Sequence, residues 1–233
     1  MIPKKIHYVW VGNKPKSKDI QRCMKTWSKH LTDYEFIEWN ENNFDINSHP
    51  FIKQAYKDKK WAYVSDYIRA YAIYHEGGIY LDTDVLVLND LQHFLNNKAF
   101  VGFENSEYPF TAVFGAEPKH PFVKKMLDYY DNIVFSFDVK DQMKNVNTKT
   151  VSNILINEYH CKQNNQEQLL ETGIRVYPDT VLCNPSTSSS AIHIFTGTWM
   201  EGSKPLKRKI NKWIKLRLTN KFMIFIFNAL NRF

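Results

Sequence analysis

The chain has 233 residues, of which 43% are hydrophobic and 24% are charged. This length suits one domain with at most a small appendage and excludes a multidomain assembly. The composition excludes a chain that is disordered throughout, because there are enough apolar residues to form a core. We therefore expect one folded domain.

The formal net charge of +7 is concentrated at the C-terminal end of the chain. Residues 204–233 contain nine of the 31 basic residues and no acidic residue, which leaves 22 basic against 24 acidic residues, a net charge of −2, in positions 1–203. Such a near-neutral body argues against a nucleic-acid-binding domain, and we expect no nucleic-acid partner. The charge instead predicts that residues 204–233 attach the protein to an anionic surface.

The cysteines and the apolar segments bear on the compartment. Cys23, Cys161 and Cys183 are odd in number and far apart, which predicts free thiols in a reducing environment. No signal-peptide segment opens the sequence, and the longest unbroken apolar run, Phe222 to Phe227, has six residues, whereas a membrane span needs about 20. These features predict a cytoplasmic protein that binds peripherally at the inner face of the cell membrane.

The hydrophobic pattern predicts alternating strands and helices. In chain order, we expect a strand at 6–11, a helix at 20–31, a strand at 34–39, and helices at 51–59 and 61–76. Strands follow at 79–81, 85–88, 99–103 and 110–116, helices at 122–133 and 150–159, and strands at 174–177 and 191–194. A strand, a helix and a strand in succession are typical of the start of a parallel α/β sheet.

The helix predicted at 61–76 carries two charged residues that could serve a ligand. Asp66 and Arg69 are three residues apart and so share one face, where they present an acceptor and a fixed cation together. Gly77 and Gly78 end this helix and allow a tight turn into the next strand. Taken alone, the charged pair would be a surface ion pair worth about 0.3 kcal/mol.

Two aspartates follow the strand predicted at 79–81, where open α/β sheets usually bind ligands. Asp82 and Asp84 can share one Mg²⁺ or Mn²⁺ ion if the backbone bends, because these hard cations prefer oxygen ligands. A metal ion near Arg69 would form a site for a diphosphate. An isolated Asp-x-Asp sequence is usually a solvated turn, so the interpretation depends on the order of the whole motif.

The stretch from Ser65 to Asp84, which contains Ser-Asp-x-x-Arg and then Gly-Gly-Ile-Tyr-Leu-Asp-Thr-Asp, resembles the signature of glycosyltransferase family 32. This family comprises the DXD-containing, sugar-binding-region glycosyltransferases and includes bacterial capsular polysaccharide and oligosaccharide transferases. Residues 2–12, 115–121 and 193–199 are also similar to the family. The resemblance implies a GT-A fold, a Rossmann-like α/β domain with a mixed central sheet, at residues 1–203. Residues 204–233 are expected to form a basic amphipathic helical tail outside it.

The resemblance also implies which residues bind the donor. Val9 and Trp10 match positions that hold the nucleotide base. Ser65, Asp66 and Arg69 match positions that hold the donor sugar and its phosphate end. For Trp10, packing in the core is the alternative.

Further matches concern the metal and the diphosphate. Asp84 matches the direct metal ligand, and Asp82 matches its partner, which reaches the ribose or the metal. His193 resembles a late histidine that completes the coordination, although the second histidine often found beside it is Ile194 here. Trp199 resembles a tryptophan over the diphosphate. Core packing is the alternative for His193 and Trp199.

The resemblance implies a retaining hexosyltransferase that depends on Mn²⁺ or Mg²⁺ and uses a nucleotide-sugar donor, for which we expect a UDP-sugar such as UDP-galactose or UDP-glucose. The expected acceptor is a glycan, specifically a lipid-linked oligosaccharide in capsule or surface polysaccharide synthesis. No residue is an obvious nucleophile; Asp66 by its position and Glu104 are the candidates. We therefore expect front-face attack, in which the leaving phosphate oxygen accepts the proton of the acceptor hydroxyl.

Other interpretations stay open. A metal-dependent nucleotide-sugar phosphodiesterase would need more ligands for a two-metal site than the sequence allows us to place. A protein without catalysis could use the basic tail alone to bind nucleic acid or a membrane. The tail itself has the composition of an interfacial helix, with apolar residues such as Ile210 and Trp213 among cations, but it could also pack on the domain or in a dimer.

Overall fold

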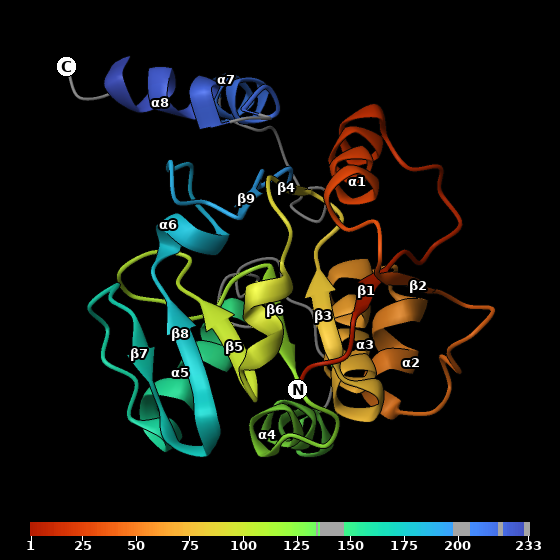
Figure 1. Cartoon of the computed structure of the whole chain (residues 1–233). Coiled ribbons are helices and arrows are strands. Elements are labelled where there is room, and N and C mark those ends of the chain that lie inside the picture. Colours follow the sequence, from red (N-terminus) through yellow and green to blue (C-terminus); the bar gives the residue numbers. More distant parts are fainter. Residues whose placement is uncertain (134, 136–146, 198–205, 219–220, 231–233) are drawn as a thin grey trace.

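A computed structural model describes residues 1–133, 135, 147–197, 206–218 and 221–230. Within these ranges, a seven-stranded sheet with the order β2-β1-β3-β6-β5-β8-β7 forms the centre of the molecule (Figure 1). Its strands are β1 (Lys5–Val9), β2 (Glu35–Trp39), β3 (Gly78–Leu81), β5 (Ala99–Gly102), β6 (Val113–Ala116), β7 (Gln168–Leu169) and β8 (Ile174–Tyr177). A separate two-stranded sheet pairs β4 (Val85–Val87) with β9 (Ala191–His193).

The large sheet is mixed. Strand β1 runs parallel to β2 and β3, and β5 runs parallel to β8. Strand β6 is antiparallel to both β3 and β5, and β7 is antiparallel to β8. The parallel start predicted from the strand-helix-strand pattern and the α/β class of the fold are both confirmed.

Helices α1 to α6 occupy segments between strands, and the last two helices follow β9. The helices are α1 (Lys18–His30), α2 (Pro50–Lys57), α3 (Trp61–Glu76), α4 (Pro121–Asp131), α5 (Asn147–Tyr159), α6 (Asp179–Leu182), α7 (Leu206–Lys215) and α8 (Lys221–Leu230). The described residues also include the short 3-10 helices η1 (Gln92–Asn96) and η3 (Glu171–Gly173). The strand expected at 110–116 begins only at Val113. Strand β7 and helix α6 escaped prediction because elements of two and four residues are too short to show a periodicity.

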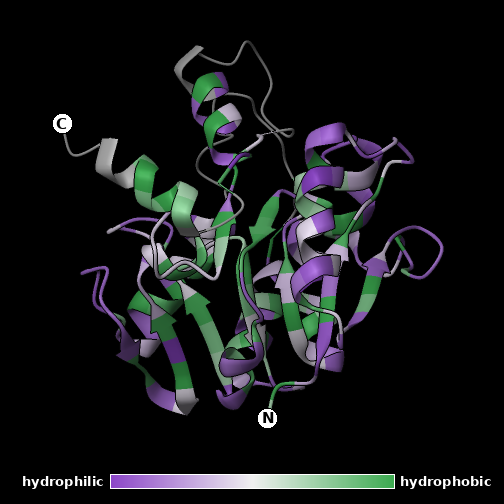
Figure 2. Ribbon diagram, turned by 45° about the horizontal axis from the view of Figure 1, so that its top comes forward, coloured by the Kyte–Doolittle hydropathy of each residue, from purple (hydrophilic) through white to green (hydrophobic). Residues whose placement is uncertain are grey.

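The two faces of the sheet pack into separate hydrophobic clusters. Along β3, Tyr80 points into a cluster that includes residues of α2, α3, α4 and α5. Its neighbours Ile79 and Leu81 point into a second cluster, which includes Trp27 of α1 and Phe94 of η1. Both faces of β3 are therefore covered, and all four of its residues are buried. Figure 2 shows the central strands mostly in the hydrophobic colour.

The Gly77-Gly78 pair determines how α3 leads into β3. Gly77 ends α3 with φ +64° and Gly78 has φ +117°, both in the range that favours glycine. A Cβ atom on Gly78 would lie only 2.8 Å from the Lys5 carbonyl oxygen. Glycine thus lets β3 enter the sheet in close contact with β1, and this entry sets where the two aspartates after β3 lie.

His7 holds this turn in place from β1. The indole N–H of Trp39 donates to Nδ1 of His7 at 3.0 Å, so Nδ1 is the acceptor nitrogen of a neutral ring. Nε2 is then the donor, and it lies 2.8 Å from the carbonyl oxygen of Gly77. The fully buried His7 ring therefore joins β2 to the start of β3 in its neutral form.

The state of the cysteines and the character of the helices can be compared with the sequence. Cys23, Cys161 and Cys183 are buried and unpaired, as the sequence predicts. No helix in the described parts of the chain has the length and apolar character required to cross a bilayer.

The buried His7 predicts a specific pH dependence of stability. Burial lowers the pKa of His7, so as the pH falls below the ordinary value of 6.5 the unfolded chain takes up a proton before the folded one does. The stabilisation from His7 is complete above pH 6.5. It is lost as the pH falls from this value through the lower pKa of the folded state. We expect the free energy of unfolding, measured with urea, to fall less for His7→Gln than for the wild type when the pH is lowered from about 7 to about 5. Parallel pH profiles for the two proteins would contradict this prediction.

Candidate active site

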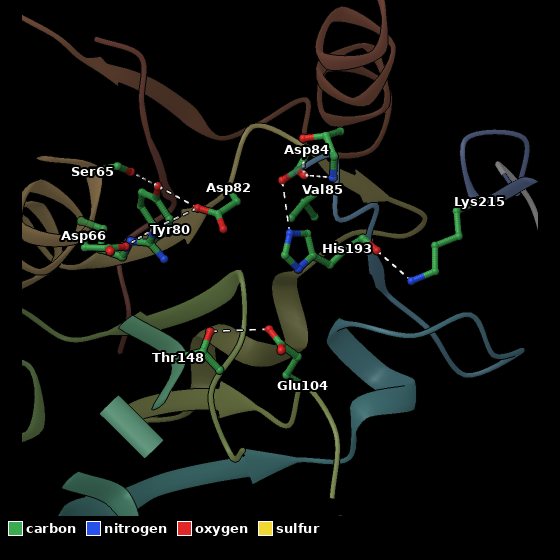
Figure 3. Close-up of polar contacts among 12 residues, drawn as sticks. Ser65, Asp66, Tyr80, Asp82, Asp84, Val85, Glu104, Thr148, His193 and Lys215 are labelled. Carbon is green, nitrogen blue, oxygen red and sulfur yellow. Dashed lines mark hydrogen bonds and ion pairs between the residues drawn. The ribbon is translucent and has the colours of Figure 1, made fainter. Parts of the chain in front are cut away.

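The pairing of β4 with β9 brings two parts of the predicted site together (Figure 3). In this antiparallel pair Val85 lies opposite His193, so Asp84, which precedes Val85, is next to the histidine. The Asp84 carbonyl also accepts the Ile194 N–H at 3.1 Å. The predicted proximity of Asp84 and His193 thus follows from a strand register.

Asp84 is a buried and fully bonded carboxylate. Its Oδ1 lies 3.3 Å from Nε2 of His193, and its Oδ2 accepts the backbone N–H and the hydroxyl of Thr196 at 2.8 and 2.9 Å. Burial opposes the charge of Asp84, but the positive charge of His193, with the hydrogen bonds from His193 and Thr196, outweighs burial and lowers the pKa of Asp84. In return, Asp84 outweighs the burial of His193 and raises the pKa of its imidazole.

These residues form a candidate metal site. Asp82, Asp84 and His193 each offer one ligand atom, and these atoms lie within 4.8 Å of one another. Nδ1 of His193 is buried and has no hydrogen-bond partner within the described part of the chain. Two carboxylates and one imidazole fit Mn²⁺ or Mg²⁺, and a bound cation would take the place of the proton on His193. The residues present therefore suit the predicted cofactor.

Arg69 connects the helix motif to the aspartates. Its Nη2 lies 2.7 Å from Oδ1 of Asp66 on the same face of α3 and 3.3 Å from Oδ1 of Asp82. The guanidinium also lies 4.8 Å from the ring centroid of Tyr80. The Tyr80 hydroxyl donates to Oδ1 of Asp82 at 3.0 Å and is 3.0 Å from the Ser65 hydroxyl. Four predicted site residues, Ser65, Asp66, Arg69 and Asp82, therefore belong to one network.

Burial and ion pairing together determine the charges of this network. Burial raises the pKa of Asp66 to about 7, against the opposing effect of Arg69. For Arg69 the two carboxylates outweigh burial and keep the guanidinium charged. Its Nε is buried and has no partner among the described residues. Arg69 thus has both a fixed orientation and one unused donor.

Glu104 approaches the same site from the end of β5 (Figure 3). Its carboxylate accepts a long hydrogen bond of 3.5 Å from the Thr148 hydroxyl. Burial raises the pKa of Glu104, while the charges of His193 and Lys215 lower it. The negative charge of Asp82 also raises the pKa of Glu104. Two of the candidate metal ligands, Asp82 and His193, are therefore electrostatic neighbours of Glu104.

The residues expected at the nucleotide base lie at the end of β1. Strands β1 and β3 are parallel neighbours, so Val9 and Trp10 lie at the sheet edge where Asp82 follows β3. Val9 is buried, whereas Trp10 is only partly buried, which disfavours simple core packing for Trp10. The Trp10 indole donates to the Lys14 carbonyl at 2.7 Å. Trp199, expected over the diphosphate, lies outside the described residues.

Two contributors to the site were missed by sequence reasoning. Thr196 orients Asp84, although the sequence analysis used its segment only for family similarity. Lys215 of α7 donates to the His193 carbonyl at 3.0 Å and lies 4.7 Å from the Phe195 ring centroid. No sequence signal separates Lys215 from the other basic residues of the tail. The tail therefore contacts the candidate site directly.

The buried ion pair makes a prediction about stability. We expect Arg69→Met to cost about 3–5 kcal/mol in urea unfolding, because it leaves Asp66 and Asp82 without their common cation. Adding Asp66→Asn should recover part of this loss, since it removes one uncompensated carboxylate. A double variant that is no more stable than Arg69→Met would contradict the electrostatic account.

Comparison with known proteins agrees with this geometry. Residues 17–101 match a family model described as the glycosyltransferase sugar-binding region containing the DXD motif. Inositol phosphoceramide mannosyltransferase 3 of Schizosaccharomyces pombe is 26% identical over 140 residues, which cover 58% of this chain and 39% of that protein. Mannosyl phosphorylinositol ceramide synthase CSH1 of Saccharomyces cerevisiae is 30% identical over 135 residues, which cover 54% of this chain and 35% of that protein. The chain thus spans well under half the length of these relatives.

Among solved structures, the glycosyltransferase PaToxG superposes with a TM-score of 0.50 at 19% identity, over 67% of this chain and 69% of that one. At this identity the likeness concerns the fold alone. It agrees with the mixed α/β sheet and with the fold predicted from the resemblance. The chain therefore has a GT-A fold, and its residues 17–101 are similar to a glycosyltransferase sugar-binding region, with Asp82 and Asp84 as the Asp-x-Asp sequence of the matched segment.

Proposed function

We propose that this protein is a metal-dependent, retaining glycosyltransferase that moves a sugar from a nucleotide donor to a glycan. The observation that carries the proposal is the meeting of Asp82, Asp84 and His193 within 4.8 Å, with Arg69 3.3 Å from Asp82. A divalent cation beside an arginine suits the diphosphate of a nucleotide sugar, which is the leaving group of such a transfer.

The chain's own residues would bind and orient the leaving group. A bound divalent cation supplies positive charge where the departing diphosphate becomes negative. Arg69 adds a second positive charge, already oriented by Asp66, so little reorganisation is needed during the reaction. Tyr80 and Thr196 hold the carboxylates of Asp82 and Asp84 through hydrogen bonds.

The two candidate nucleophiles are poorly suited to attack. Asp66 is engaged by Arg69, whose Nη2 lies 2.7 Å from its Oδ1, so this carboxylate is not free to attack. The Glu104 carboxylate accepts a hydrogen bond from the Thr148 hydroxyl, and burial raises its pKa. These environments support front-face attack, with the leaving phosphate oxygen taking the proton of the acceptor hydroxyl. Glu104 is then a residue that contacts the substrates rather than one that forms a covalent bond.

The donor and the acceptor belong to the proposal as well. A UDP-sugar, with galactose or glucose, remains the donor expected from the sequence. The two fungal relatives are named for mannosyl transfer, which adds mannose to the sugars to be tested. Their names also specify a phosphorylated ceramide lipid, which supports a lipid-linked acceptor here. Attachment of residues 204–233 to the inner face of the cell membrane would bring the enzyme to such an acceptor, in capsule or surface polysaccharide synthesis.

A nucleotide-sugar phosphodiesterase is the weaker candidate. A two-metal hydrolase needs ligands for a second ion close to the first. Among the described residues, Asp82, Asp84 and His193 form a cluster that suits one ion. Transfer to an added glycan acceptor, rather than hydrolysis of the diphosphate bond, separates the two activities.

The test is turnover across a panel of UDP-glucose, UDP-galactose and GDP-mannose with Mn²⁺. We expect one donor to lose its sugar only when the metal is present. Asp84→Asn should lower this rate at least about 100-fold, because it weakens a metal ligand, while Asp58→Asn, an exposed carboxylate directly after α2, should leave it unchanged. The α anomer as the first product, detected by NMR, would support retention. Equal rates for Asp84→Asn and the wild type would reject the metal assignment.

A further inference from the structure

A pocket of about 470 Å³ lies between α1, the segment after β9, and α7. We refer to it as the α7 pocket. Basic side chains from two distant parts of the sequence line it, together with two aromatic rings. The basic residues are Arg22, Lys209, Lys212 and Arg217, and the rings belong to Phe195 and Trp213.

The α7 pocket has an excess of positive charge. Among the described residues that line it, Asp19 is the one acidic residue, and Lys212 already binds it at 2.7 Å. Arg217 lies 3.6 Å from the Trp213 ring centroid, so its planar guanidinium is held at the wall of the pocket. Within the described part of the chain, Arg22 and Lys209 have no ion-pair partner. With Lys212 paired to Asp19, three further cations, Arg22, Lys209 and Arg217, leave an excess of positive charge that suits a phosphate group.

The α7 pocket adjoins the candidate metal site. Thr196 lines the pocket and also holds Asp84 through its N–H and hydroxyl groups. In Figure 3, Lys215 of α7 lies on one side of Asp84 and His193, and Asp66 lies on the other side. Leu216, which follows Lys215, lines the pocket, so the pocket lies near the end of the site that is opposite Asp66 in this view. If Asp66 contacts the donor sugar, the opposite end is left for the acceptor.

An exposed apolar surface accompanies the α7 pocket. The segment after α7 packs on the body through Leu216 and Leu218, and α8 does so through Ile224; all three are buried with residues of β4 and β9. The two helices also expose large apolar side chains, including Trp213 at 56%, Phe222 at 72% and Phe225 at 61%. Cations beside exposed aromatic and aliphatic residues are typical of surfaces that meet lipid headgroups and acyl chains.

We propose that the α7 pocket binds the phosphate of a lipid acceptor's headgroup and so places the acceptor glycan beside the metal site. This inference rests on the proposed glycosyltransferase function. The pocket supplies the anion contacts, and the exposed residues of α7 and α8 supply the membrane contact. Lipid binding and catalysis are then joined through α7, whose Lys215 contacts the His193 carbonyl.

The test compares two variants of equal charge in the full chain. Arg22→Gln with Lys209→Gln removes the two unpaired cations of the α7 pocket. Lys25→Gln with Lys29→Gln removes two exposed cations of α1 that do not line the pocket. Each protein is sedimented with phosphatidylcholine vesicles that contain phosphatidic acid, and with phosphatidylcholine vesicles alone.

We expect the pocket variant to lose at least about tenfold in affinity for the phosphatidic acid vesicles, and the control to stay within about threefold of the wild type. Equal losses in both variants would show general electrostatic attraction and overturn the proposal. These measurements need no donor turnover, so their failure is distinguishable from failure of the proposed transferase activity.

Two further measurements identify the source of the phosphate. The first is binding of inorganic phosphate to the wild type, measured by ³¹P NMR. If phosphate binds but the protein binds neither kind of vesicle, the ligand is a soluble phosphate and the lipid proposal is wrong. If the pocket variant instead loses affinity for UDP or GDP in parallel with its vesicle binding, the pocket belongs to the donor. Unchanged nucleotide affinity with weakened vesicle binding supports the acceptor site.

Discussion

The pairing of β4 with β9 is the constraint on which the candidate site depends. Its register sets Val85 opposite His193 and so brings Asp84 to the histidine. Thr196, in the segment after β9, donates from its N–H and its hydroxyl to the second oxygen of Asp84. A two-residue shift of this register would separate the residues that form the candidate metal site, although the seven-stranded sheet would remain intact.

A second constraint is electrostatic. Three carboxylates, those of Asp66, Asp82 and Asp84, lie close together in a partly buried region. Their negative charges would repel one another without nearby cations. Arg69 compensates two of them, and His193 compensates the third. These pairs balance the negative charges of the site. A metal ion would replace the proton of His193, so the same residues serve folding and binding.

The position of α7 changes the meaning of the basic tail. From composition, residues 204–233 are a cationic appendage with an affinity for anionic surfaces. In the structure, Leu216 and Leu218, directly after α7, are buried against the body, and Lys215 of α7 donates to the His193 carbonyl. Trp213, Phe222 and Phe225 stay exposed, so packing on the domain and contact with a membrane are compatible. Composition could not show this, because all nine basic residues of the tail look alike in sequence.

The sequence by itself determined the α/β class, most of the helices and strands, and the motif from Ser65 to Asp84. These features are local, since periodicity, glycine placement and residue order act over a few neighbouring residues. The meeting of Asp84 with His193 was expected from resemblance alone, and its cause, the β4–β9 register, exists only in three dimensions. The contributions of Thr196 and Lys215 and the α7 pocket were decided by tertiary structure, because they arise where segments distant in the sequence pack together.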